Sequence, residues 1–158
     1  MIELHLDILT ADGAMNTFVV HPEEGGSLPV VLFYMDAPGK REELHDMARR
    51  IATVGYYVVL PNLYYRKTRE FRMARDEEGY KRMFAMMEHL STDLIMRDTQ
   101  AMLDFVDARK EAKASSLGVV GYCMSGPYVF AAAARFPGRV KCAASLYGVR
   151  LATDHEQS

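Results

Sequence analysis

One cysteine is distinguished by the residues around it. Cys123 lies in the hexapeptide Gly-Tyr-Cys-Met-Ser-Gly at 121–126, between an apolar stretch at 116–120 and an alanine-rich stretch at 129–135. This order is typical of a strand, a tight turn and a helix, and Pro127 falls in the first helical turn, where proline is tolerated. The glycines leave room for a sharply bent backbone that would hold the thiol at a helix N-terminus. We expect a nucleophile at such a position.

The same turn could also stabilise an oxyanion. A helix N-terminus favours the reactive thiolate form of a cysteine. The N–H of Met124 could point at a developing negative charge, and a second donor could come from the loop after an earlier strand, where Ala37 has an N–H and Pro38 has none. The alternative is a packed core cysteine, because free cysteine is among the most buried residue types. The position between strand and helix favours the nucleophile.

The other cysteine and the histidines fit a catalytic or metal-binding role less well. Cys142 falls inside an apolar stretch and is predicted to be a core residue, and the two cysteines have neither pairing nor metal spacing, which suits a reducing compartment. His155 follows the nucleophile and adjoins Asp154, but sequence neighbours cannot both reach the positions of a triad, and the pair is too small for a metal site. The other four histidines are predicted to be solvated side chains: His5, His21, His45 and His89.

An opening hairpin and a strand–helix–strand unit precede the turn. Alternating apolar residues at 2–8 predict a half-buried strand, and Asp12-Gly13 predicts a turn into a second strand at 16–20. The apolar run 28–35 is typical of a strand covered on both faces. An apolar stripe over 44–52 then predicts a helix, followed by a third apolar strand at 56–60.

The remaining elements complete an alternating pattern. Two helices are predicted, one at 77–87 and one that starts after Ser91, and a last strand is predicted at 140–147. Strands that alternate with helices predict a single α/β domain over residues 1–158 with a largely parallel sheet. Ligands bind at the carboxyl ends of such strands. The residues expected to converge there are Asp36, Asn62, Cys123 and Tyr147.

Composition excludes several classes of partner. The chain has 158 residues, which fits one core, and its 19 basic and 21 acidic side chains leave a net charge of −2. This balance argues against nucleic acid or an anionic membrane surface as a partner. No apolar run approaches the ~20 residues that a membrane span needs. Residues 1–7 lack the basic head and apolar core of a signal peptide, so we expect a cytoplasmic protein with a small-molecule partner.

Four stretches together resemble the dienelactone hydrolase family, a branch of the α/β-hydrolase fold that uses a cysteine nucleophile. Besides the hexapeptide, residues 61–64 (Pro-Asn-Leu-Tyr) resemble its Pro-Asp-Leu-Tyr, and residues 146–149 (Leu-Tyr-Gly-Val) resemble its Tyr-Tyr-Gly-Val. Asp36 stands where the family has an acidic residue that touches the resting cysteine. The chain departs from the family in that Asp36 is shorter than the usual glutamate and Ser125 replaces a glycine.

The resemblance implies a three-layer α/β sandwich that hydrolyses a small lactone or ester through an acyl-cysteine, without a cofactor or metal. Cys123 would be the nucleophile, Asp36 its acidic neighbour, and the backbone of Ala37 and Met124 the oxyanion hole. The candidate substrate-pocket residues are Tyr64, Arg75, Tyr80, Tyr122 and Tyr147.

The family's chain continues through two more strands, whose loops carry the catalytic aspartate and histidine. We therefore expect a fragment, or a protein that lost those strands, with little activity by itself. The strand at 140–147 would then be an exposed apolar edge that favours self-association. The alternative function is a non-hydrolytic one: a thiol redox or sensor module, or a binding scaffold.

Overall fold

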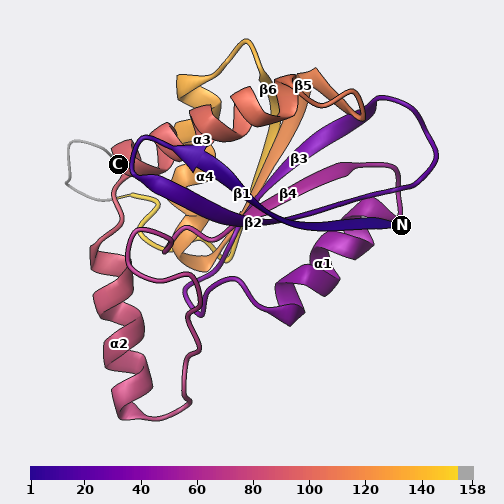
Figure 1. Ribbon diagram of the computed structural model, residues 1–158. Coiled ribbons are helices and arrows are strands. Elements are labelled where there is room, and N and C mark those ends of the chain that lie inside the picture. Colours follow the sequence, from indigo (N-terminus) through magenta and orange to yellow (C-terminus); the bar gives the residue numbers. More distant parts are fainter. Residues whose placement is uncertain (153–158) are drawn as a thin grey trace.

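The computed structural model describes residues 1–152 and contains a six-stranded sheet with the order β1-β2-β4-β3-β5-β6 (Figure 1). The strands β1 (Ile2–Thr10) and β2 (Gly13–His21) form the predicted antiparallel hairpin, which joins the sheet through an antiparallel pairing of β2 with β4 (Tyr57–Pro61). The remaining strands, β3 (Leu28–Tyr34), β5 (Ala112–Tyr122) and β6 (Val140–Leu146), run parallel to β4. The predicted sheet, largely parallel with an opening antiparallel hairpin, is therefore confirmed.

Helices cover both faces of this sheet. The helix α1 (Glu42–Ala52) packs on β2 and β4, whereas α3 (Thr92–Asp107) and α4 (Gly126–Arg135) pack on each other and on the opposite face (Figure 1). The helix α2 (Glu77–Glu88) stands away from these layers. No helix within residues 1–152 is long and apolar enough to cross a membrane. The result is the predicted three-layer sandwich.

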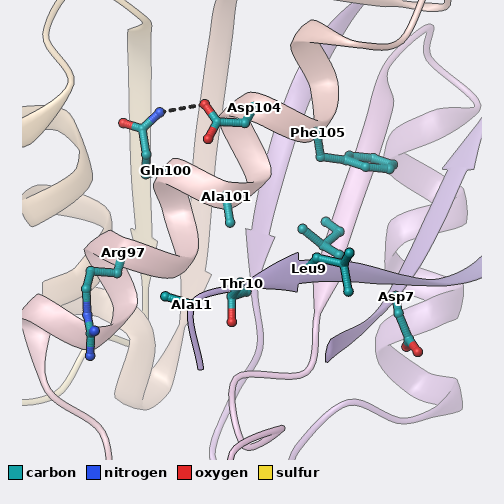
Figure 2. A pocket seen from close by; sticks show the side chains of 10 residues that line it. Asp7, Leu9, Thr10, Ala11, Arg97, Gln100, Ala101, Asp104 and Phe105 are labelled. Atoms are coloured by element: carbon teal, nitrogen blue, oxygen red, sulfur yellow. Dashed lines mark hydrogen bonds between the residues drawn. The ribbon is translucent and has the colours of Figure 1, made fainter. Parts of the chain in front are cut away.

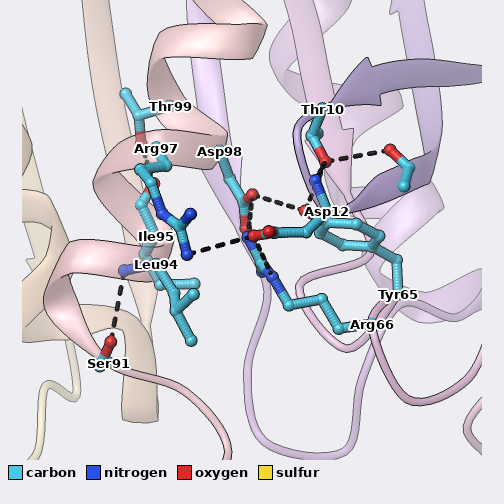
Figure 3. A network of polar contacts seen from close by, with 11 residues as sticks. Thr10, Asp12, Tyr65, Arg66, Ser91, Leu94, Ile95, Arg97, Asp98 and Thr99 are labelled. Carbon is cyan, nitrogen blue, oxygen red and sulfur yellow. Dashed lines mark hydrogen bonds and ion pairs between the residues drawn. The ribbon is translucent and has the colours of Figure 1, made fainter.

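Side-chain caps define the starts of two helices. The carboxylate of Asp76 accepts a hydrogen bond of 2.7 Å from the Gly79 N–H at the start of α2. The hydroxyl of Ser91 accepts one of 3.3 Å from the Leu94 N–H at the start of α3 (Figure 3). Such caps satisfy backbone donors that have no partner inside the helix.

A buried ion pair ties α3 to the hairpin. Asp98 of α3 is fully buried, and its carboxylate accepts hydrogen bonds from both terminal nitrogens of Arg66, at 2.6 and 2.8 Å, and from the Tyr65 hydroxyl at 2.9 Å (Figure 3). Arg66 also pairs with Asp12 in the β1–β2 turn, at 2.8 Å. Burial raises the pKa of Asp98, and the Arg66 guanidinium opposes that shift. The network joins α3, the hairpin turn and the loop after β4.

The last strand forms the exposed edge expected for residues 140–147, and this position overturns the prediction for Cys142. β6 pairs with β5 alone among the described strands, and its residues 141–144 are exposed. Cys142 is consequently an exposed thiol, and its predicted place in the core is wrong. The apolar pattern of this strand resembles that of the central strands, but its position at the edge of the sheet decides its exposure.

Candidate active site

The backbone at Cys123 adopts a strained conformation. β5 ends at Tyr122, and Cys123 has a φ of +54° before a short 3-10 turn (Cys123–Ser125) leads into α4. A non-glycine residue with positive φ is uncommon. The bend needs glycine on both sides: a Cβ on Gly121 would lie 2.5 Å from the Val129 Cγ2 atom, and one on Gly126 would lie 2.5 Å from the Gly148 Cα atom. The predicted strand–turn–helix unit is confirmed.

The turn opens into a cavity of about 540 Å³ that Cys123 lines. Three other predicted site residues line it as well, namely Ala37 from the loop after β3, Arg75 from the segment before α2, and Tyr80 from α2. These four residues come from three separate parts of the chain, so the fold brings together the thiol, one proposed oxyanion donor and two proposed substrate contacts. The remaining lining residues are Pro38, Arg41, Glu43, Phe71, Arg72, Met73 and Met83.

Asp36 pairs with an arginine. Its two carboxylate oxygens accept hydrogen bonds from the two terminal nitrogens of Arg41, at 2.5 and 2.9 Å. These hydrogen bonds raise the pKa of Arg41, which holds it as a cation. No hydrogen bond joins Asp36 to Cys123 within the described part of the chain. A contact between this carboxylate and the thiol therefore stays a prediction, and Arg41 is a site residue that the sequence analysis missed.

Three predicted tyrosines do not line the cavity. Tyr64 is buried behind its wall, where its hydroxyl donates a hydrogen bond of 2.9 Å to the Ala37 carbonyl. Tyr122 packs against Phe33, with ring centroids 5.1 Å apart. Tyr147 is 85% exposed. Contact of these three rings with a substrate therefore stays a prediction.

The histidines that the structure describes lie outside the cavity. His5 and His89 are exposed, as predicted, but the prediction of solvated side chains is wrong for His21 and His45. His21 stacks on Tyr57 and His45 stacks on Phe18, with centroid separations of 4.9 and 4.3 Å. In each case an aromatic ring from another element covers the histidine ring. Asp154 and His155 lie outside the described residues.

A second cavity, of about 410 Å³, lies between the end of β1 and α3 (Figure 2). Its walls include Leu9, Arg97 and Phe105, and the amide of Gln100 donates a hydrogen bond of 2.8 Å to Asp104. Neither cysteine lines it. Residues 1–152 also contain no cluster of three or more histidine, cysteine or acidic side chains that could hold a metal. The Cys123 cavity is therefore the candidate active site.

A family model and the named relatives of this chain point to the same protein family. The model of the "Dienelactone hydrolase family" matches residues 15–158. A protein from Methylorubrum extorquens named "Putative carboxymethylenebutenolidase" is 28% identical over 137 residues, which cover 87% of this chain and 46% of the relative. A protein of the same name from Synechocystis is 27% identical over 131 residues, covering 83% of this chain and 52% of the relative. The chain spans about half the length of the curated relatives it matches.

Solved structures share the fold. The crystal structure of "Putative Dienelactone Hydrolase" from Klebsiella pneumoniae has a TM-score of 0.81 at 23% identity, covering 99% of this chain and 64% of that one. The dienelactone hydrolase from Anabaena variabilis has a TM-score of 0.68 at 18% identity, with coverages of 93% and 63%. The predicted α/β-hydrolase-like architecture is confirmed.

Proposed function

Because this chain belongs to the dienelactone hydrolase family, we propose that it acts on small carboxylic esters or lactones by forming an acyl-thioester on Cys123. One observation carries the proposal: the strained backbone of Cys123 at a strand–helix turn that opens into the 540 Å³ cavity. A conformation of this kind costs about 1–3 kcal/mol and collects at functional sites, where the surrounding structure imposes it. The turn also exposes the thiol to the cavity.

The first chemical step is acyl transfer to sulfur. The Cys123 thiolate attacks the carbonyl carbon of the ester, and the carbonyl oxygen becomes an oxyanion. The backbone N–H groups of Ala37 and Met124 are the proposed donors to that oxygen. Met124 lies in the first turn of a helix, where N–H groups have no intrahelical acceptor. Collapse of the intermediate breaks the bond to the leaving alkoxide, which takes up a proton, and leaves a thioester on Cys123.

The second step, hydrolysis of the thioester, needs a base that activates water. No histidine lines the cavity within residues 1–152, and His21 and His45 are held in aromatic stacks. We therefore assign acyl transfer to the described residues, whereas rapid turnover requires an imidazole from outside them. Without such an imidazole beside Cys123, the chain is expected to accumulate the acyl form.

The cavity wall favours a compact substrate with apolar and anionic parts. Phe71, Met73 and Met83 supply an apolar wall, and the exposed Arg72 and Arg75 lie at its rim. Guanidinium groups recognise carboxylates by charge-assisted hydrogen bonds. A small ester or lactone that carries a carboxylate fits this distribution, with Arg75 and Tyr80 as the proposed contacts.

Burst kinetics with p-nitrophenyl acetate test the proposal. We expect one equivalent of p-nitrophenol per chain in a rapid phase, followed by slow release. Cys142→Ser is the matched control, because it removes the exposed thiol and should keep the burst. Cys123→Ser should abolish it. A burst that survives in Cys123→Ser and disappears in Cys142→Ser would contradict the proposal.

A further inference from the structure

The loop after β3 is held by three consecutive carbonyl groups. The Met35 carbonyl accepts a hydrogen bond from the Ser125 hydroxyl at 2.5 Å, the Asp36 carbonyl accepts one from the Gly39 N–H at 3.1 Å, and the Ala37 carbonyl accepts one from the Tyr64 hydroxyl at 2.9 Å. The peptide unit that contains the Asp36 carbonyl also contains the Ala37 N–H. Its orientation is therefore fixed directly by Gly39 and on either side by Ser125 and Tyr64.

Ser125 connects this loop to the turn that contains the nucleophile. It belongs to the same 3-10 turn as Cys123 and Met124 and is fully buried. Serine at the N-cap of a helix usually accepts a hydrogen bond from the helix backbone. Ser125 is the N-cap residue of α4 but makes no such bond, and its hydroxyl donates instead to the Met35 carbonyl in the loop after the neighbouring strand β3. The side chain thus links the two loops that carry the proposed oxyanion donors.

Tyr64 makes a second link between the same two loops. Its hydroxyl oxygen, which donates to the Ala37 carbonyl, also lies 3.3 Å from the Met124 Sδ atom. Asn62 fixes the start of this segment, because its side-chain oxygen accepts a hydrogen bond of 3.0 Å from the Tyr64 N–H. Burial raises the pKa of Tyr64, and the negative charge of Asp36 acts in the same direction. The hydroxyl is therefore protonated and able to donate at neutral pH.

We infer that Ser125 and Tyr64 are positioning residues that set the separation between the Ala37 and Met124 N–H groups and so build the oxyanion hole from two otherwise independent loops. The inference rests on the proposed function, because it concerns acyl transfer to Cys123. The Ala37 N–H has no hydrogen-bond acceptor among residues 1–152, so it is available to a substrate oxygen. Neither side chain needs to touch the substrate to affect the rate.

Two reactions of the same thiol separate positioning from general damage. Acylation by p-nitrophenyl acetate passes through an oxyanion, whereas alkylation by iodoacetamide displaces iodide at a saturated carbon and forms none. Loss of a single oxyanion donor costs about 100-fold to 1,000-fold. Displacement of a donor in Ser125→Ala or Tyr64→Phe should therefore slow acylation by about tenfold or more and leave alkylation within about twofold of wild type.

Thr17→Val is the matched control. Thr17 is also buried and also donates its hydroxyl to a backbone carbonyl, that of Met15 at 2.9 Å, but it lies on β2, away from the site. Both rates should stay at the wild-type level in this variant. If Ser125→Ala does not fold, Tyr64→Phe carries the same test, because it keeps the ring.

The outcomes distinguish the two proposals. A wild-type chain that is alkylated but not acylated at Cys123 would overturn the proposed function and the inference with it. A wild-type chain that is acylated, with variants acylated equally fast, would overturn the inference alone. Equal slowing of acylation and alkylation would assign these side chains a structural role and would also overturn it.

Discussion

Arg41 binds both carboxylate oxygens of Asp36, at 2.5 and 2.9 Å, beside the cavity that Cys123 lines. The two side chains are only 32% and 20% exposed, so water screens the pair incompletely. A carboxylate without a partner disfavours ionisation of a nearby thiol. Pairing with Arg41 therefore makes the surroundings of Cys123 less negative than the acidic residue alone would.

Removal of Arg41 should slow the reaction of the Cys123 thiol with an alkylating reagent. In Arg41→Ala the Asp36 charge is uncompensated, so we expect alkylation of Cys123 by iodoacetamide at neutral pH to slow by about threefold. The double variant Arg41→Ala/Asp36→Asn removes both charges and should return close to the wild-type rate. Arg50→Ala, which breaks an exposed pair with Asp46, is the control and should change nothing. An unchanged rate in Arg41→Ala would show that this pair does not influence the thiol.

The bend at Cys123 should tolerate no side chain at its two glycines. Gly121→Ala and Gly126→Ala each place a Cβ 2.5 Å from a neighbouring carbon, so we expect a loss of about 1–3 kcal/mol in the free energy of unfolding, measured with urea. Gly138→Ala is the matched control, because a Cβ there meets nothing within 4 Å. It should change stability by less than about 0.5 kcal/mol. Equal effects at all three positions would contradict the steric argument.

The buried Asp98–Arg66 pair should matter far more than an exposed pair of the same kind. Asp98→Asn leaves the Arg66 guanidinium without its buried partner, and we expect a loss of about 3 kcal/mol or more in the free energy of unfolding. Asp107→Asn breaks the exposed pair with Arg139 at the other end of α3 and should cost less than about 1 kcal/mol. Similar losses in the two variants would show that burial of Asp98 does not decide its contribution.

The unit around Cys123 could be predicted because its signals are local. An apolar run, two glycines and an alanine-rich segment specify strand, turn and helix, and β5, the 3-10 turn and α4 follow that order. The apolar pattern predicts a strand from residue 116, but β5 begins at Ala112, because Ala112 and Lys113 pair with Leu28 and Pro29 before a shift of register. Such pairing depends on the neighbouring strand, so a local pattern does not contain it.

Contacts between segments far apart in the sequence explain the predictions that were wrong or incomplete. His45 lies on a helix whose composition predicts solvent exposure, but the hairpin brings Phe18 against its ring. Cys142 lies in an apolar strand that forms the edge of the sheet. The hydrogen bond from Ser125 to Met35 spans 90 residues. No pattern within one segment predicts these contacts. For Ser125 the sequence does contain one signal, because a serine stands where the family has a glycine.

Stability should depend on pH through His45. Burial lowers the pKa of His45, Lys40 and His5 act in the same direction, and Glu42 opposes them. Because the folded pKa lies below the value of about 6.5 for an unfolded histidine, the folded state binds fewer protons and stability falls as pH drops below about 6.5. His45→Phe should lose less stability than wild type between about pH 7.5 and about pH 5, as measured by urea midpoints. His89→Gln, at an exposed position, should follow wild type, and a His45→Phe profile parallel to wild type would contradict this assignment.

The most direct test of the central claim is to map where an activated ester acylates the chain. After brief exposure to p-nitrophenyl acetate, proteolysis and mass spectrometry compare two thiols in the same sample, the half-buried Cys123 at the strained turn and the exposed Cys142. If exposure alone decided the reaction, Cys142 would be acylated faster. We predict that the acetyl group is found on Cys123, and acetylation confined to Cys142 would contradict the assignment of Cys123 as the nucleophile.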